Sequence, residues 1–297
     1  MTERTKGPDF LVIGAMKCAT STLHSQLGAQ PGIFTTDLKE PNFFGDEANF
    51  TRGLDSYESL FQSAPLNALK GESSTHYSKR DEFPRACERI HDYDPNMRIV
   101  YVMRNPISRM VSHYQHEWIE GTITCSLNQA VLDHPELILQ GCYAWQLRPY
   151  LQRFGAERVL PVFFERLLLE PNAELERIAR HIGSAGIVSW KQEIGAHNQS
   201  VDRRKSDPLR TLARKIPGHA SLAKLLPSGL RRRIESRWKI PDQVTLSAEA
   251  AQHAKHFFDR DLERLGRWLE TPLNTDNYDD AVTDRTLHWC RSAKEAA

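Results

Sequence analysis

A lysine and three hydroxyl side chains follow a short apolar segment close to the start of the chain. Residues 10–14 are apolar and end in glycine, which is typical of a buried parallel strand. Lys17 comes next, and the three hydroxyl residues after it are Thr20, Ser21 and Thr22. We expect these hydroxyls to cap the start of a helix, where backbone N–H groups and the helix dipole bind anions such as phosphate.

This segment is not the phosphate loop of nucleoside triphosphatases, because the order G-x-x-x-x-G-K-[ST] is absent. The difference disfavours an ATP-dependent enzyme but does not argue against another ligand that carries phosphate. The alternative interpretation is that Thr20 only caps a helix and that Lys17 is solvated.

A second group of polar side chains follows the β-branched run at residues 98–103, which predicts another strand. Arg104 leaves this strand, and Pro106 is suited to the first turn of the next helix. Ser112 lies eight residues after the arginine on that helix. A forked guanidinium and a nearby hydroxyl form a suitable site for a second phosphate group.

The order of the elements predicts an α/β fold. A third strand is expected at residues 159–164, where Pro161 favours an edge position or a strand start. Helical patterns occupy residues 20–27, 57–62, 81–90, 107–118, 127–133, 143–154, 173–182 and 247–269. Alternating strands and helices predict a three-layer sandwich with a central, mainly parallel sheet flanked by helices. We expect one domain over residues 1–297, with a basic insertion or lid at about 197–245.

Charge is concentrated in that insertion, although the net charge of the whole chain is only +1. Residues 201–240 contain twelve Lys and Arg against three Asp and Glu. Such a segment could bind a nucleotide, a polyanionic acceptor, nucleic acid or an anionic membrane surface. The alternative is a solvated helix face whose cations pair with acids elsewhere in the fold.

The cysteine content and the apolar segments indicate the compartment. The five cysteines are an odd number without C-x-x-C spacing, which argues against a zinc site and a full set of disulfides. No metal site is predicted. Because the first residues are polar and no apolar stretch approaches 18 residues, we expect a cytoplasmic protein without a membrane anchor.

The two phosphate-binding segments resemble the 5′-phosphosulfate loop and the 3′-phosphate motif of PAPS-dependent sulfotransferases, where PAPS is 3′-phosphoadenosine 5′-phosphosulfate. The likeness is strongest to the heparan sulfate, or carbohydrate, branch of that family. Similar segments follow in order at residues 39–44, 71–77, 104–114, 164–167 and 261–265, and residues 205–245 have no clear counterpart. The resemblance implies a P-loop-like fold, PAPS as donor and adenosine 3′,5′-bisphosphate as product.

The resemblance also implies roles for individual residues. Lys17 matches the lysine that stabilises charge on the leaving phosphate. The 5′-phosphate would be bound by the loop and helix start formed by Lys17, Cys18, Ala19, Thr20, Ser21 and Thr22. Arg104 and Ser112 would bind the 3′-phosphate that distinguishes PAPS from ATP. A later loop with Arg203, Arg204 and Lys205 would be a third donor-binding segment.

Glu40 matches the glutamate that accepts the proton of the acceptor hydroxyl. The alternative for Glu40 is a helix cap or a surface acid before Pro41. Rival bases are His76, His113 and His116, because a histidine has this role in the small-molecule branch of the superfamily.

Contacts with the acceptor are expected from Lys39, Glu72, His76 and His116. Two positions depart from the family pattern. Heparan-type enzymes often carry lysine where this chain has Ser73, which puts the contacts around Glu72 in doubt. Cys18 and Ala19 replace a pair that usually contains glycine, so the backbone there must avoid positive φ or accept strain.

The function that follows from the resemblance is transfer of a sulfuryl group from PAPS to a hydroxyl, or to an amine, of a carbohydrate, glycolipid or small natural product. Two alternatives stay open. One is a nucleotide or nucleoside kinase with a variant phosphate loop, and the other is a non-enzymatic module that binds polyanions through the basic segment. No nucleic-acid-binding motif is present, so a nucleic-acid partner is not expected. The sequence does not indicate the oligomeric state.

Overall fold

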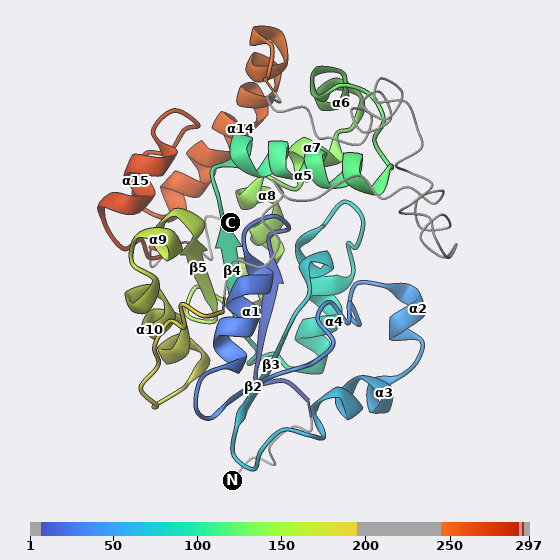
Figure 1. Ribbon diagram of the computed structural model, residues 1–297, viewed down its shortest axis with the longest axis vertical. Coiled ribbons are helices and arrows are strands. Elements are labelled where there is room, and N and C mark those ends of the chain that lie inside the picture. The colour runs from blue at the N-terminus through green and yellow to red at the C-terminus, as the bar shows by residue number, and fades with distance from the viewer. Residues whose placement is uncertain (1–6, 195–244, 291–292, 294–297) are drawn as a thin grey trace, which may run out of the picture.

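A five-stranded parallel sheet forms the centre of the protein (Figure 1). The computed structural model describes residues 7–194, 245–290 and 293. The strands are β1 (Phe10–Gly14), β2 (Ile33–Thr35), β3 (Leu69–Ser73), β4 (Arg98–Met103) and β5 (Val159–Phe163). Their order is β2-β3-β1-β4-β5, and every neighbouring pair is parallel. The predicted α/β class with a mainly parallel sheet is therefore confirmed.

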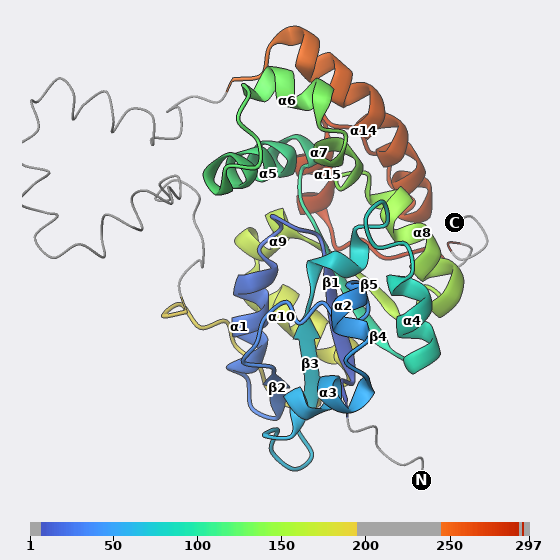
Figure 2. The same cartoon turned by 90° about the vertical axis from the view of Figure 1, so that its right-hand side faces the viewer.

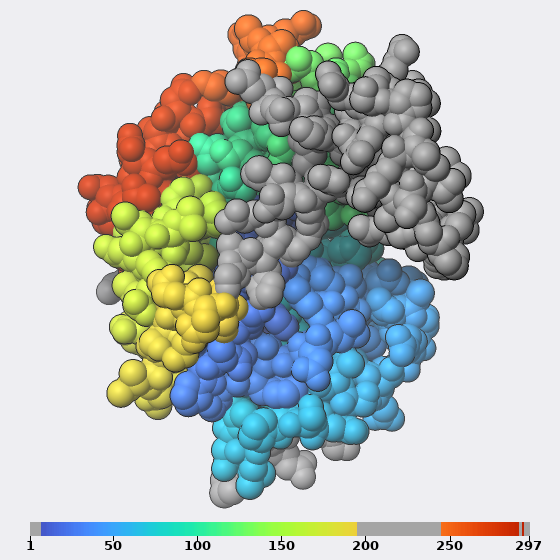
Figure 3. Space-filling model, viewed as in Figure 1, coloured from blue at the N-terminus to red at the C-terminus, as the bar shows by residue number. Residues whose placement is uncertain are grey.

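Helices cover both faces of this sheet and complete the three layers (Figure 2). α1 (Thr20–Gly28) and α10 (Pro171–Ile182) lie on one face, and α4 (Ala86–Tyr93) and α8 (Tyr143–Phe154) lie on the other. The space-filling view shows the yellow segment that follows α10 directly beside the blue α1 region (Figure 3). Parallel sheets require this double cover because both of their faces are apolar.

A second, helical layer of core lies beyond the carboxyl ends of the strands (Figure 2). It is built by α5 (Pro106–Glu120), α6 (Leu127–Asp133), α7 (Glu136–Leu139) and α14 (Ala248–Trp268). The remaining elements are α2 (Glu47–Phe50), α3 (Leu54–Glu58), η1 (Ser59–Phe61), η2 (Thr75–Ser78), α9 (Phe164–Leu169) and α15 (Tyr278–Asp284). Among the helices that the structure describes, none is long and apolar enough to cross a membrane.

Strands β1, β4 and β5 confirm the three strands expected from their apolar runs. All five residues of β1 are buried, as continuous apolar sequence requires in a parallel sheet. Pro161 lies in β5, an edge strand, where the missing N–H removes no bond to a further neighbour. Its carbonyl accepts a hydrogen bond of 2.8 Å from Arg177 Nη2.

Sequence patterns did not indicate β2 and β3 as strands. β2 has only three residues, and β3 reads Leu-Lys-Gly-Glu-Ser, which has neither an apolar run nor alternation. Glu72 is nevertheless fully buried in β3, because hydroxyl groups satisfy its carboxylate. Gly71 is buried too, and the ring of Phe10 occupies the space where a side chain would stand.

The helix predictions agree with the structure to different degrees. The bounds predicted at residues 127–133 and 143–154 coincide with α6 and α8. The helix predicted at 81–90 instead begins at Ala86, after Pro84, because the residue before a proline avoids the helical region. The pattern at 57–62 corresponds to the end of α3 and the short 3₁₀ turn η1.

The contact between Gly71 and Phe10 gives a stability prediction. In Gly71→Ala the new Cβ would overlap the Phe10 ring, which the packed core cannot move away. Overpacking of this kind lowers the free energy of unfolding by ~1–3 kcal/mol, measurable by urea denaturation. Gly186→Ala is the matched control, since its nearest new contact is 3.6 Å away. Equal stability of both variants would contradict this account of β3.

Candidate active site

The carboxyl ends of β1 and β4 lie side by side and carry the residues expected to bind phosphate, and the neighbouring β3 ends beside the carboxylate of Glu40. This edge of a parallel sheet is where α/β proteins bind their ligands. Arg104, which follows β4, directs Nη1 toward the carbonyl of Lys17 in the loop after β1, at 3.5 Å. The two phosphate-binding segments predicted from the sequence are therefore adjacent in space.

The loop between β1 and α1 has a left-handed backbone at two residues without glycine. Lys17 has φ 70° and Ala19 has φ 63°. The sequence left two alternatives, a backbone that avoids positive φ or a strained one, and the structure has the strained one. A left-handed residue other than glycine costs on the order of 1 kcal/mol. Cys18 between them is fully buried, and burial raises the pKa of its thiol to about 12, which keeps the thiol protonated.

The expectation that hydroxyls cap α1 is wrong. Ala19 is the N-cap residue, and no side chain caps the helix start. The first N–H groups of α1 are therefore not bonded to a capping side chain, and they are suited to bind an anion. Thr20 and Thr22 are largely buried, whereas Ser21 is half-buried at the start of α1.

Backbone contacts from two other elements fix the position of Arg104. The Tyr143 hydroxyl in α8 donates to the Arg104 carbonyl at 2.6 Å and accepts from its N–H at 3.2 Å. Glu165 Oε1 accepts a hydrogen bond of 2.8 Å from the N–H of Asn105. The guanidinium lies 4.7 Å above the ring of Phe164, a cation–π contact that orients its plane.

Ser112, the other residue expected at the 3′-phosphate, lies about two turns into α5 and is 8% exposed. α5 crosses the carboxyl edge of the sheet (Figure 2). Arg104 directly follows β4 and Ser112 lies in α5, so the two residues come from a strand end and the helix next to it along the chain.

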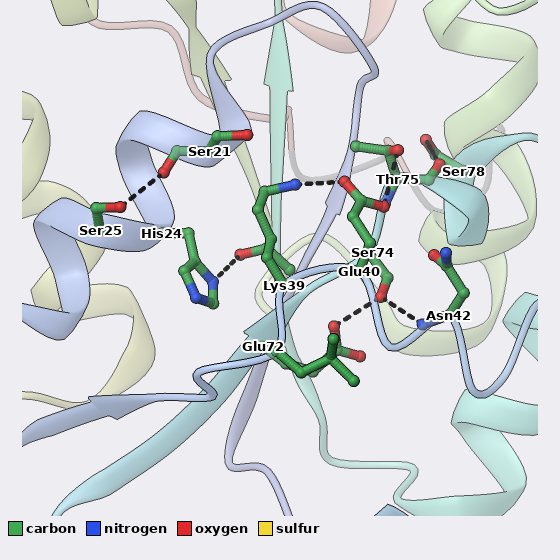
Figure 4. Close-up of polar contacts among 12 residues, drawn as sticks. Ser21, His24, Ser25, Lys39, Glu40, Asn42, Glu72, Ser74, Thr75 and Ser78 are labelled. Atoms are coloured by element: carbon green, nitrogen blue, oxygen red, sulfur yellow. Dashed lines mark hydrogen bonds and ion pairs between the residues drawn. The ribbon is translucent and has the colours of Figure 1, made fainter. Parts of the chain in front are cut away.

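Glu40 lies in the loop after β2, and both of its carboxylate oxygens have partners (Figure 4). Oε2 accepts hydrogen bonds from Thr75 N at 2.8 Å and from Thr75 Oγ1 at 3.1 Å. Lys39 Nζ forms an ion pair with Oε1. The helix-cap alternative for Glu40 is wrong, because Asp46 caps the next helix, α2. The side chain is 30% exposed, so solutes can reach it.

A buried histidine holds the start of the loop that carries Glu40. His24 Nε2 lies 3.0 Å from the carbonyl of Thr36, which can only accept, so Nε2 carries the hydrogen. Nδ1 then accepts from Ser73 Oγ at 2.9 Å, and the ring is neutral. Burial lowers the pKa of His24, which is consistent with this state.

Glu72 lies beneath the site and not at its surface. The side chain is fully buried, and it accepts hydrogen bonds from Tyr57, Tyr77 and Ser74 at 3.2, 2.6 and 2.8 Å. Burial raises the pKa of Glu72 to about 7, and the three hydroxyls partly oppose this rise. These contacts argue against the direct contact with an acceptor that we expected from the sequence.

The histidines expected near the acceptor differ in accessibility. His76 is half-buried and stacks on Phe83 with ring centroids 4.4 Å apart. Burial and the charge of Lys79 lower its pKa, while Glu40 opposes that change. His76 thus lies within electrostatic range of Glu40. Lys79 was not among the residues expected from the sequence.

His113 is a poor base because it lies in the protein interior. It is 2% exposed, between Arg109 on one side and Glu117 on the other, each at 3.5 Å. Burial is the main cause that lowers the pKa of His113 to about 4, and the charge of Arg109 lowers it further. The hydrogen bond from His113 lowers the pKa of Glu117 to about 2, and His116, half-buried on the same helix, adds to this effect.

Several residues of the site had no clear sequence signal. Ser74 and Thr75 lie inside a segment that resembles the family, but the sequence does not indicate that they bind Glu72 and Glu40. Tyr143 stands 39 positions from Arg104, which it contacts. Contacts between residues so far apart in the sequence depend on the fold. The only sequence signal for them was that parallel strands end at the same edge of the sheet.

Some expectations fall outside the described residues. These are the third donor-binding segment, with Arg203, Arg204 and Lys205, and the basic insertion at 197–245. The organisation as one domain also stays a prediction. Within the part of the chain that is described, no three His, Cys, Asp or Glu side chains form a metal-binding group.

A cavity of about 510 Å³ lies at the opposite end of the sheet. Its lining includes Asp9, Gly32 and Leu69, which precede or begin β1, β2 and β3. The cavity therefore does not contribute to the site at the carboxyl ends.

The buried carboxyl of Glu72 predicts a pH dependence of stability. Its pKa is raised from 4.5 to about 7, so the folded chain binds this proton more tightly than the unfolded chain. The stability that results is present below pH 4.5 and is lost as the pH rises through about 7. Glu72→Gln resembles the protonated acid and cannot titrate, so it should flatten this fall.

Urea denaturation across this pH range measures the effect, with exposed Glu88→Gln as the control. Asp261, whose pKa burial raises to about 6, is present in both proteins and cancels in the comparison. A Glu72→Gln protein with the wild-type pH dependence would contradict the prediction.

Comparison with known proteins identifies the family. The sequence matches the model of the sulfotransferase domain over residues 7–268. Human heparan sulfate glucosamine 3-O-sulfotransferase 6 is 28% identical over 196 residues, which cover 63% of this chain and 56% of that protein. A bifunctional heparan sulfate N-deacetylase/N-sulfotransferase 1 of Caenorhabditis elegans is 21% identical over 285 residues, 89% of this chain and 31% of that protein.

The chain thus spans about half the length of the first relative and about a third of the second. A sulfotransferase structure from Alicyclobacillus acidocaldarius has the same fold, with a TM-score of 0.55 and 24% identity. The alignment covers 76% of this chain and 99% of that one. Because the family match extends over residues 7–268 of 297, this protein belongs to the sulfotransferase family.

Proposed function

We propose that the protein transfers the sulfuryl group of PAPS to a hydroxyl or an amine of a carbohydrate acceptor. The observation that carries the proposal is the contact of Arg104 with the Lys17 loop, close to the loop that holds Glu40. PAPS has phosphate groups at both its 5′ and its 3′ positions, and two cationic segments lie together here. The similar human and nematode proteins are named heparan sulfate sulfotransferases, which favours a carbohydrate acceptor.

The donor would be held at its two phosphate positions. Lys17 and the uncapped N–H groups of α1 supply positive charge for the 5′-phosphosulfate. Arg104 would bind the 3′-phosphate, with Ser112 adding a hydroxyl from α5. Tyr143 would hold the backbone of Arg104 and Phe164 its guanidinium, which reduces the entropy lost on binding.

The transfer step needs a base, a positioned donor and a stabilised leaving group. As the acceptor oxygen or nitrogen bonds to sulfur, its proton passes to Glu40, and the bond between sulfur and the phosphate oxygen breaks. Lys17 would stabilise the charge left on that phosphate oxygen. Thr75 donates twice to Oε2 of Glu40 and Lys39 pairs with Oε1, so Lys39 would have to move away for Oε1 to take the proton.

Family membership weighs against the kinase alternative, which also lacks the triphosphatase loop sequence. The alternative of a polyanion-binding module depends on residues 201–240, which lie outside the described residues. The cytoplasmic location expected from the sequence remains a prediction. The difference between hydroxyl and amine acceptors is left to experiment, since the similar relatives are named for both reactions.

Donor binding is tested with adenosine 3′,5′-bisphosphate and Arg104→Ala. We expect the wild type to bind the bisphosphate in preference to ATP and AMP. Loss of charge-assisted hydrogen bonds worth ~1.5–3 kcal/mol should weaken binding in the variant by about 10- to 100-fold. Isothermal titration calorimetry measures both proteins. Arg158→Ala, at the opposite end of the sheet, is the control. Equal affinity for ATP in the wild type would refute the donor assignment.

Catalysis is tested with Glu40→Gln and radiolabelled PAPS, using heparan sulfate oligosaccharides as acceptors. The amide that replaces the carboxylate cannot take a proton, so turnover should fall by ~10²- to 10⁴-fold while bisphosphate affinity stays unchanged. Glu88→Gln on α4, exposed on the surface, should keep full turnover. Undiminished turnover in Glu40→Gln would exclude Glu40 as the base and favour His76 or His116.

A further inference from the structure

The hydroxyl of Ser74 connects the buried Glu72 to the loop that carries Glu40. We define residues 39–42 as the Glu40 loop. Ser74 Oγ donates to Glu72 Oε2 at 2.8 Å and accepts from the N–H of Asn42 at 3.0 Å. Figure 4 shows this serine between the carboxylate and the loop. These two hydrogen bonds link Glu72, in the core of the protein, to the loop of the proposed base.

The Glu40 loop needs restraints from outside, because its backbone is unfavourable by itself. Glu40 has φ 61° and Asn42 has φ 52°, both in the left-handed region. Such conformations persist only where the surroundings determine them. Three restraints come from the end of β3: Ser73 O accepts from Glu40 N at 3.0 Å, Ser74 Oγ accepts from Asn42 N, and Thr75 donates to the Glu40 carboxylate.

The restraint from Ser74 depends on Glu72. A serine hydroxyl has one hydrogen, and donating it to Glu72 turns its lone pairs toward Asn42. Ser74 is fully buried, so water cannot take over either contact. The two tyrosines hold the other oxygen, Oε1, with Tyr77 at 2.6 Å making the shorter bond. The shorter bond from Tyr77 thereby fixes the carboxylate in the orientation that Ser74 requires, and it is kept when the longer bond from Tyr57 is removed.

We propose that Glu72 is a positioning residue that acts through Ser74 to hold the Glu40 loop, and with it the Glu40 carboxylate, in the reactive geometry. This inference rests on the proposed role of Glu40 as the base. Glu72 itself contacts neither donor nor acceptor, because its side chain has no exposed surface. Small displacements of a base matter, since proton transfer requires hydrogen-bond distance to the acceptor group.

Two variants that each delete one hydroxyl donated to Glu72 test the inference. Ser74→Ala removes the contact that continues to Asn42, whereas Tyr57→Phe keeps the stacked ring and removes a contact that ends at Glu72. We expect turnover with heparan sulfate oligosaccharides to fall about tenfold in Ser74→Ala and less than about twofold in Tyr57→Phe. Bisphosphate affinity should be unchanged in both, so the loss appears in kcat.

Hydrogen–deuterium exchange of the peptide that contains residues 39–42 gives a readout that is independent of turnover. Exchange of the Asn42 amide should rise in Ser74→Ala and stay at the wild-type level in Tyr57→Phe. Equal changes in the two variants, or full turnover in Ser74→Ala, would overturn the inference. Absence of sulfuryl transfer in the wild type would contradict the proposed function instead, and the exchange comparison would still decide whether Ser74 holds the loop.

Discussion

The parallel pairing of β3, β1 and β4 is the constraint on which the site depends. All three strands end at the same edge, so segments far apart in the sequence deliver Thr75, Lys17 and Arg104 to one place. The pairing is possible because helices cover both faces of an almost entirely buried sheet. A strand of opposite direction at any of these positions would move its polar residue to the other end of the molecule.

The two loops that carry the proposed base and the proposed phosphate-binding lysine share an unfavourable backbone. Lys17, Ala19 and Glu40 all have positive φ without being glycine. Neighbours in other elements hold these loops: Thr75 in η2 binds the Glu40 carboxylate, and the Tyr143 hydroxyl in α8 contacts Cys18 Sγ, between Lys17 and Ala19, at 3.9 Å. Strained loops held by rigid elements are common where geometry must be precise, because the bound conformation then exists before the ligand arrives.

The sequence was informative where chemistry and local pattern coincide. Apolar runs identify β1, β4 and β5, and the polar residues after two of them identify Lys17 and Arg104. β3 could not be recognised, because its polar Glu72 is buried only through hydroxyls contributed by α3, η2 and Ser74. The helix cap was misassigned for a similar reason: three hydroxyls suggest a cap, whereas the loop conformation places Ala19 there. Partners supplied by tertiary structure leave no local pattern.

The departure at Ser73 has a physical explanation that bears on acceptor recognition. Successive residues of β3 point to opposite faces, so Glu72 faces Tyr57 and Tyr77 while Ser73 faces α1. Ser73 is 1% exposed and donates to His24, which in turn holds the start of the segment leading to Glu40. A lysine here would need space for a long cation inside this packed contact. The serine therefore supports the loop that carries the proposed base. Positive charge for an anionic acceptor would have to come from other side chains. Lys39, the nearest cation in sequence to Glu40, is already paired with that glutamate.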